Sequence, residues 1–197
     1  MIALTDLWLP ILVSAVVVFV ASALAWMVLP HHKPDIKFLQ NEQEQAFAST
    51  LKEQNIAPGV YMFPGCDHES IKTDEGKARF QAGPWGVLML QSSAPNFGRN
   101  LGLVFVFYLV VSLFVAYLTS FASIAGTNFM DTFRVASTAA IACYCLAGIP
   151  HAIFFGRPMR TVIVEIIDGL VYGLLTGTIF ALLWPVASAP VVPGIPT

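Results

Sequence analysis

Four long apolar stretches, separated by polar segments of very different length, organise the chain. They lie at about residues 7–29, 101–122, 135–155 and 161–184. Each reaches the roughly 20 apolar residues that a helix needs to cross a hydrocarbon core about 30 Å thick. The pattern predicts an all-α membrane protein with four transmembrane helices, the last of which is uncharged only from Gly169 onward.

The segment 30–98 is the only sizeable polar part of the chain, and it lies between the first two apolar stretches. Asn41, with Glu44 as its capping partner, predicts the start of a helix over 42–55. Two short strands are expected at 60–63 and 86–91, with a helical turn or two at 74–80 between them.

These elements predict a small α+β insert rather than a catalytic domain. Its strands are apolar on both faces, which favours burial against the membrane helices or a partner. The domain boundaries are expected at 1–29 for the first helix, 30–98 for the insert and 99–185 for the other three helices. A Pro-rich extended tail is expected over 186–197.

Composition supports the membrane assignment. Hydrophobic residues make up 56% of the 197 residues and charged residues 11%, against about 25% charged residues in soluble domains. The net charge of -2 gives no reason to propose a nucleic-acid partner. The low charged fraction and the four apolar stretches make the lipid bilayer the expected surroundings. Three cysteines without paired spacing (Cys66, Cys143 and Cys145) predict free thiols.

The basic residues predict the orientation of the helices. Seven Lys or Arg residues lie between the first and second stretches, and two more, Arg157 and Arg160, lie between the third and fourth. The remaining one, Arg134, ends the connection between the second and third stretches. By the positive-inside rule the insert is cytoplasmic and both termini are extracytoplasmic. The first stretch is longer than a signal-peptide core and no basic residue precedes it, so we expect a retained helix.

One row of residues on the fourth stretch predicts close helix packing. Glu165, Gly169, Gly173 and Gly177 are each four residues apart, and Asp168 flanks the same row. Small residues at this spacing let two helix backbones approach closely in lipid. The third stretch offers a matching row, which consists of Ala139, Cys143, Ala147 and His151.

The same two helices carry ionisable side chains near their cytoplasmic ends. Counting 1.5 Å per helical residue from the connecting turn brings His151 and Glu165 to the same depth. We therefore expect Glu165 to pair with His151, or with Arg157 and Arg160, in one interface with Asp168 and the glycines. The cluster is interpreted first as structural, with proton or cation handling as the alternative because intramembrane ionisable residues mark functional sites.

Two further site hypotheses remain open. His151 could be the single ligand of a haem or chlorophyll, although no second histidine lies inside a span. His31, His32, Cys66 and His68 are of types that bind zinc or another transition metal, but their spacing matches no recognised ligand motif. No cofactor is expected, and the absence of phosphate-loop, nucleophile-elbow and zincin motifs predicts a protein that is not an enzyme.

Two segments carry a resemblance to known proteins. VLPHHKPDIKFLQNEQEQAFASTLKEQNIAPGVYMFP at 28–64 and IDGLVYGLLTGTIFALLWP at 167–185 resemble a group of bacterial four-span inner-membrane proteins with no assigned activity. The chain departs from that group at 39–41, where Leu-Gln-Asn replaces the usual Leu-Pro and acids. The resemblance implies the bacterial inner membrane and the same topology.

These observations lead to three hypotheses about function. The first is a non-catalytic accessory or scaffolding subunit that packs against other integral membrane subunits, as in a respiratory or photosynthetic complex. The second is a small transporter or proton- or cation-handling protein that uses Glu165, Asp168 and His151. The third is a metal-binding membrane protein.

Overall fold

The structure is a computed structural model of the whole chain, and it describes residues 2–186. The extended tail expected over 186–197 lies outside these residues apart from Val186.

Four helices of the described part are long and apolar enough to cross a membrane, as the sequence predicted. The first span, Leu4–Val28, joins a 3-10 turn to α1 (Trp8–Ala23) and a π-helical turn η2 (Leu24–Val28). The second is α4 (Phe97–Ala122) and the fourth is α7 (Met159–Leu182). The third is made of α5 (Phe129–Ile141), a π-helical turn η5 (Ala142–Leu146) and α6 (Ile149–Phe154).

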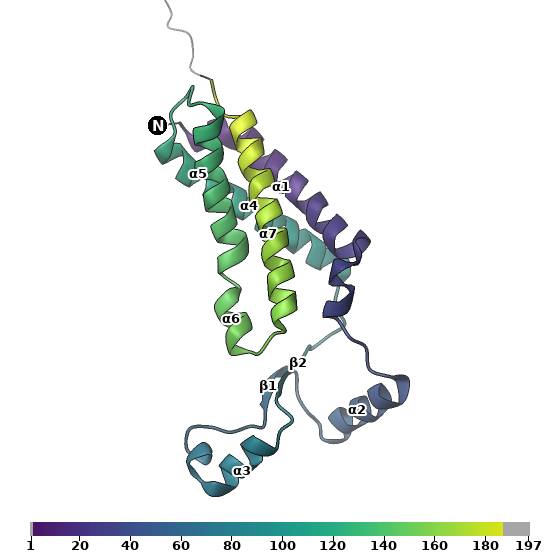
Figure 1. Cartoon of the computed structure of the whole chain (residues 1–197). Helices are drawn as coiled ribbons and strands as arrows, with labels where there is room; N and C mark the ends of the chain where they lie inside the picture. Colours follow the sequence, from purple (N-terminus) through teal and green to yellow (C-terminus); the bar gives the residue numbers. More distant parts are fainter. Residues whose placement is uncertain (1, 187–197) are drawn as a thin grey trace, which may run out of the picture.

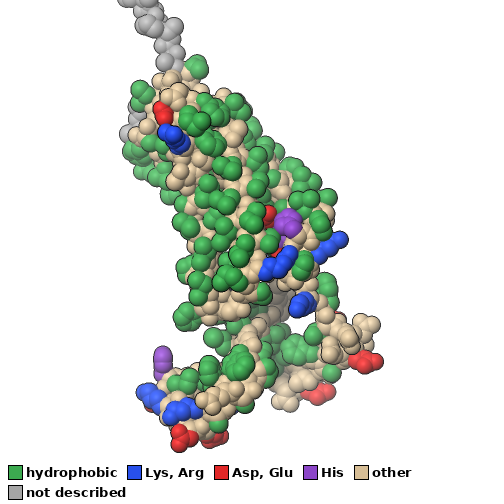
Figure 2. Space-filling view, viewed as in Figure 1, with side chains coloured by type: hydrophobic (Ala, Val, Ile, Leu, Met, Phe, Trp, Pro, Cys, Tyr) green, Lys and Arg blue, Asp and Glu red, His purple; other side chains and the backbone are tan. Residues whose placement is uncertain are grey.

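The four spans form one bundle with a small core and an apolar exterior. α5 lies against α7 along its length, and α1 packs on both α4 and α7 (Figure 1). Val115, Ala136 and Phe180 are fully buried between them. Hydrophobic side chains cover most of the face of the bundle seen in Figure 2, as a lipid-facing surface requires.

The third span is interrupted, whereas the sequence predicted one continuous helix at 135–155. The α-helical hydrogen-bond pattern ends at Ile141, continues as η5, and restarts as α6 at Ile149. Pro150 stands at the start of α6, where its missing N–H costs nothing because no intrahelical partner exists there. Side chains of both α5 and η5 lie against α7.

The insert lies beyond the end of the bundle opposite the N-terminus (Figure 1). It begins with the short helical turn η3 (Pro30–Asp35) and the helix α2 (Asn41–Glu53). β1 (Gly59–Phe63) and β2 (Gly86–Leu90) form the expected antiparallel pair, with Tyr61 opposite Leu88. The turn η4 (Ser70–Lys72) and α3 (Asp74–Ala82) lie between the strands.

Two details of the insert differ from the prediction. The N-cap of α2 is Gln40 rather than Asn41, and the Gln43 side chain accepts the Gln40 N–H at 3.3 Å in the place expected for Glu44. The strands are not buried, since Val60 is 66% exposed and Met89 71% exposed.

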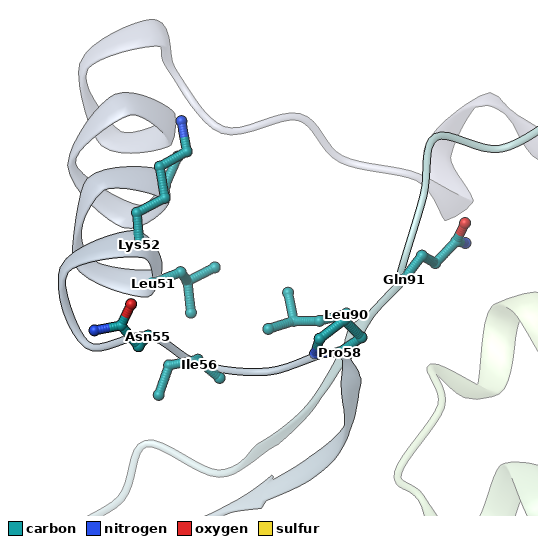
Figure 3. A pocket seen from close by; sticks show the side chains of 8 residues that line it. Leu51, Lys52, Asn55, Ile56, Pro58, Leu90 and Gln91 are labelled. Carbon is teal, nitrogen blue, oxygen red and sulfur yellow. The ribbon is translucent and has the colours of Figure 1, made fainter.

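A depression of about 610 Å³ separates α2 from the hairpin. Leu51 and Ile56 border it on one side and Leu90 on the other (Figure 3). The two parts of the insert therefore share no closed core of their own.

Candidate functional site

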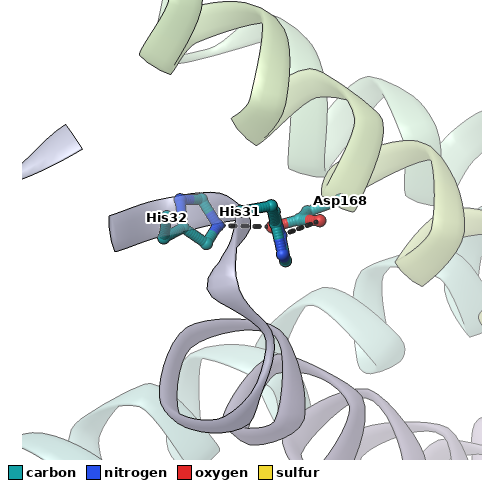
Figure 4. A group of neighbouring side chains, drawn as sticks. All are labelled: His31, His32 and Asp168. Carbon is teal, nitrogen blue, oxygen red and sulfur yellow. Dashed lines mark hydrogen bonds and ion pairs between the residues drawn. The ribbon is translucent and has the colours of Figure 1, made fainter. Parts of the chain in front are cut away.

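Three side chains from two distant segments meet where the insert joins the bundle (Figure 4). His31 and His32 come from η3, directly after the first span, and Asp168 comes from the third turn of α7. The ring of Trp26 in η2 stacks on that of His32, with centroids 3.7 Å apart and an interplanar angle of 8°. A π-helical turn and a proline-bounded turn thus fix the two imidazoles against α7.

The ligating atoms of these residues converge on one point. His32 Nε2 lies 2.7 Å from Asp168 Oδ2, and His31 Nε2 lies 3.2 Å from Asp168 Oδ1. All three residues offer a ligand atom within 4.8 Å of the others. His32 is 4% exposed and Asp168 13%, whereas His31 is 31% exposed, so the cluster is open to solvent at His31.

A second layer of polar groups holds His32 in place. Its Nδ1 lies 2.8 Å from Asp35 Oδ2, and Asp35 also accepts a hydrogen bond from Thr161 Oγ1 at 3.1 Å. Arg160 forms an ion pair with Asp35 and donates to the backbone oxygen of His31 at 2.7 Å. Thr161 and Asp168 are seven residues apart, which places them on the same face of α7 two turns from each other.

The polar groups around Asp35 keep it ionised. The hydrogen bond with His32, together with Thr161 and the Arg160 guanidinium, lowers the pKa of Asp35. Asp35 is therefore a carboxylate at neutral pH. Both ring nitrogens of His32 lie within hydrogen-bond distance of a carboxylate oxygen, with Nδ1 2.8 Å from Asp35 and Nε2 2.7 Å from Asp168. A proton between Nε2 and Asp168 fits this distance, whereas a tetrahedral Zn²⁺ bonded to both atoms would need them about 3.3 Å apart.

The glycine row of α7 packs against the third span, but not against the expected residues. A Cβ added to Gly173 would lie 2.4 Å from Ile141 Cγ1, and one added to Gly177 would lie 2.6 Å from Ser137 Cβ. Gly169 lies against Cys145 and the Tyr144 carbonyl. The helices thus approach closely, as predicted for Gly169, Gly173 and Gly177.

The facing row predicted on the third span is wrong by part of a turn. Ala147 and His151 are exposed, and Ala139 and Cys143 are only partly buried. The row that contacts the glycines runs through Ser137, Ile141 and Cys145. The observed row also has a spacing of four, but it is offset by two residues, or about 200° around the helix, and the offset is present at Ser137, before η5 begins.

The acids do not share one interface with the glycines and His151. Glu165 forms a two-contact ion pair with Arg157, in which Nη1 lies 3.0 Å from Oε2. His151 is exposed, and its ring lies against Phe155 instead of Glu165. Asp168 contacts His31 and His32 of η3, whereas the glycines contact α5 and η5.

The other predicted metal-ligand candidates lie apart from this cluster. Cys66 is a free thiol in the insert, 3.8 Å from the Gly76 carbonyl oxygen and from the Arg79 guanidinium. His68 belongs to the same loop before η4. Asp168, and neither Cys66 nor His68, therefore lies beside His31 and His32.

No protein-family model matches the chain, and no curated protein or solved structure is significantly similar to it. The geometry of the site itself is therefore the evidence for its chemistry.

Two imidazoles and one carboxylate are ligands that first-row transition metals accept. Zn²⁺ binds His nitrogen and Asp oxygen in four-coordinate sites, whereas Ca²⁺ and Mg²⁺ take oxygen ligands. A metal-bound histidine commonly donates its second N–H to a carboxylate, which fixes the tautomer and the ring orientation. His32 and Asp35 have this arrangement. The cluster can therefore hold a metal through three protein ligands and leave one position free.

Sequence reasoning missed Asp35 and the meeting of η3 with α7. A local signal existed, because His32 and Asp35 are three residues apart in PHHKPD and can bond within one helical turn. No local pattern links positions 32 and 168, which are 136 residues apart.

Proposed function

We propose that this chain is a multi-pass membrane protein that binds a transition-metal ion, such as Zn²⁺, through His31, His32 and Asp168. The observation that carries the proposal is the convergence of two Nε2 atoms on the partly buried Asp168 carboxylate, while His32 Nδ1 lies 2.8 Å from Asp35.

The setting of the centre supports a membrane-interface role. η3 follows directly on the first apolar span, and Asp168 lies nine residues from the start of α7, or about 14 Å at 1.5 Å per residue. The distribution of Lys and Arg supports a cytoplasmic location for this end. The resemblance of 28–64 and 167–185 to bacterial inner-membrane proteins supports that membrane, and both segments contribute to the centre.

The test is metal binding by the full-length protein in detergent. After treatment with a chelator and gel filtration, titration with Zn²⁺ or Co²⁺ is expected to show one ion per chain. His31→Gln and Asp168→Asn should each abolish tight binding. Asp35→Asn should weaken it by about 10- to 100-fold, because Asp35 orients His32 without touching the ion.

His151→Gln and His68→Gln are the matched controls, since both remove an imidazole outside the cluster. They should leave the metal affinity unchanged. If the wild-type protein binds no ion while remaining folded, the cation between His32 and Asp168 is a proton and the cluster is structural. If the His68 variant loses the metal as the Asp168 variant does, the ligands are assigned wrongly.

A second function, that of an accessory subunit, is favoured by one surface. The hairpin of the insert exposes Met62, Trp85 and Met89, and a groove of about 350 Å³ lies between it and Phe154 and Phe155 at the end of α6. We propose that another integral membrane subunit covers this surface, because exposed apolar groups of this size on a polar insert favour a partner.

The test is isolation from native membranes in mild detergent. A partner should be recovered at a fixed ratio with the wild-type chain and lost with Trp85→Glu or Met89→Glu. Thr127→Glu, at the other end of the bundle, is the control and should retain the partner. Recovery of the wild-type chain as a solitary monomer would contradict this role.

A further inference from the structure

The insert is joined to the bundle by two stretches of chain without regular secondary structure. Residues 36–40 follow η3, residues 91–96 precede α4, and both stretches are exposed. Beyond them, α2 and the hairpin lie past the end of the bundle (Figure 1). These connections do not fix the orientation of the insert by themselves, so side-chain contacts must hold it against the bundle.

The polar contacts that hold the insert are confined to η3. Within residues 2–186, every hydrogen bond and ion pair between residues 30–95 and the four spans involves η3 on one side and α7 on the other. The helices α2 and α3 and the hairpin make no such bond to the spans in this part of the chain. The contacts join three residues of η3 to three of α7, namely His31, His32 and Asp35 to Arg160, Thr161 and Asp168.

The apolar groove beside the hairpin has one wall on the insert and the other on the bundle. Met62 and Trp85 line it on the insert, and Phe154 and Phe155 line it at the end of α6. Its volume of about 350 Å³ therefore depends on how the insert sits against the bundle. Since η3 carries the polar contacts, the surface offered to a membrane partner depends on whether η3 stays on α7.

A metal ion would bind only while η3 lies on α7. Two of the three ligands come from η3 and the third comes from α7. Without an ion, part of the contact competes with solvent, because His31 is 31% exposed and Arg160 49%. A ligand that binds one of two arrangements shifts the population toward that arrangement.

We propose that the contact between η3 and α7 is a latch for the insert, and that a metal ion in the cluster closes it. With the ion bound, the insert stays docked and the groove keeps both of its walls. The control by the ion rests on the metal binding proposed above. The latch itself needs only the contacts of η3 with α7.

The test is the distance between insert and bundle, measured by pulsed electron spin resonance on the full-length protein in detergent. Spin labels at Ala78→Cys in α3 and Ala147→Cys in the third span report it, since both residues are exposed. The native cysteines are replaced by Cys66→Ser, Cys143→Ala and Cys145→Ala. Chelator-treated protein with an intact latch should give one main distance, with an undocked fraction of at most about 10%.

Arg160→Gln is the informative variant, because it removes the bonds to Asp35 and to the His31 carbonyl but keeps all three metal ligands. Without metal, its undocked fraction should rise several-fold. One equivalent of Zn²⁺ should return the distance distribution to that of the intact latch. Asp168→Asn should also release the insert, but Zn²⁺ should not restore it, because a ligand is lost.

Arg157→Gln is the matched control, since this guanidinium lies at the same end of the bundle and bonds to Glu165 instead of the insert. It should leave the distances unchanged. Equal broadening in the two arginine variants, or an unchanged distribution in Asp168→Asn, would overturn the latch.

The metal arm separates this inference from the proposed metal centre. If Arg160→Gln holds Zn²⁺ by titration and its distance distribution stays broad, the ion does not control the insert although the metal centre stands. If the protein with the intact latch binds no Zn²⁺, the metal centre and the control by the ion fail together. The metal-free variants then still decide whether η3 is a latch.

Discussion

Three glycines of α7, which have no Cβ, allow α5 and α7 to lie close together. Gly169, Gly173 and Gly177 face the third span so closely that a methyl group at any of them would overlap a neighbour. In lipid, where apolar surfaces gain little from contact as such, this close approach of the backbones is the main source of helix association.

Gly173→Ala should therefore destabilise the bundle by about 1–3 kcal/mol, the range for overpacking a filled interior. The added Cβ would lie 2.4 Å from Ile141 Cγ1 and 3.0 Å from the Ile141 backbone nitrogen, so side-chain movement alone cannot relieve the overlap. Unfolding in mixed micelles measures the change.

Gly102→Ala is the matched control, since nothing lies within 4 Å of a Cβ there and the residue is also inside a membrane helix. It should be neutral or stabilising by up to about 1 kcal/mol from helix propensity. Equal effects of the two substitutions would contradict the account of the glycine row.

The Arg157–Glu165 ion pair is expected to contribute little to the free energy of unfolding. Both side chains are about one-third exposed, with values of 38% and 33%, so solvent screens their attraction. A double-mutant cycle with Arg157→Gln and Glu165→Gln should give a coupling free energy below about 1 kcal/mol that falls with added salt. A cycle between His151 and Glu165 should give no coupling; a larger value there would restore the pairing first expected from the sequence.

At the scale of elements, α7 is the helix that organises the site. One face carries the glycines toward α5, and another carries Thr161 and Asp168 toward η3. The sequence indicated the glycine face because its period of four is a local pattern. The second face could not be assigned, because its partner is an irregular turn whose position depends on how the first span ends.

The packing face of the third span also could not be assigned from the sequence. Its apolar length correctly predicted a helical segment long and apolar enough to cross a membrane, yet the row facing α7 was misassigned. The observed row through Ser137, Ile141 and Cys145 keeps the step of four but lies on another face of the helix. Small and polar residues occur on more than one face of this span, so the sequence did not decide which face packs against α7.

The insert is expected to be the least stable element of the chain. Its sheet has only two strands, and an isolated hairpin is at best marginally stable. Amide protons of β1 and β2 should exchange far faster than those of α7 in the purified protein, as hydrogen-exchange mass spectrometry would show. If a partner covers the hairpin in the native membrane, protection there should rise in the isolated complex. Equal protection of the hairpin and α7 in the purified monomer would contradict the exposed hairpin described here.

At the scale of the whole molecule, four spans place the insert and the loop between α4 and α5 at opposite ends of the bundle. Membrane-impermeant maleimide tests this directly. In a chain with Cys143→Ala and Cys145→Ala, Cys66 should react only after the cells are opened. Thr127→Cys, introduced together with Cys66→Ser, should react in intact cells. The reverse pattern would contradict the orientation, and reaction of both in intact cells would contradict the number of spans.

The central proposal for this protein is a cation held between η3 and α7. X-ray absorption at the zinc edge, on full-length protein loaded with one equivalent of Zn²⁺, tests it most directly. The account predicts a low-coordinate site with two imidazole nitrogens and a carboxylate oxygen at about 2.0–2.2 Å. The imidazole signal should diminish in His31→Gln and remain in His68→Gln. A sulfur ligand at about 2.3 Å, or a spectrum of fully hydrated Zn²⁺, would contradict it.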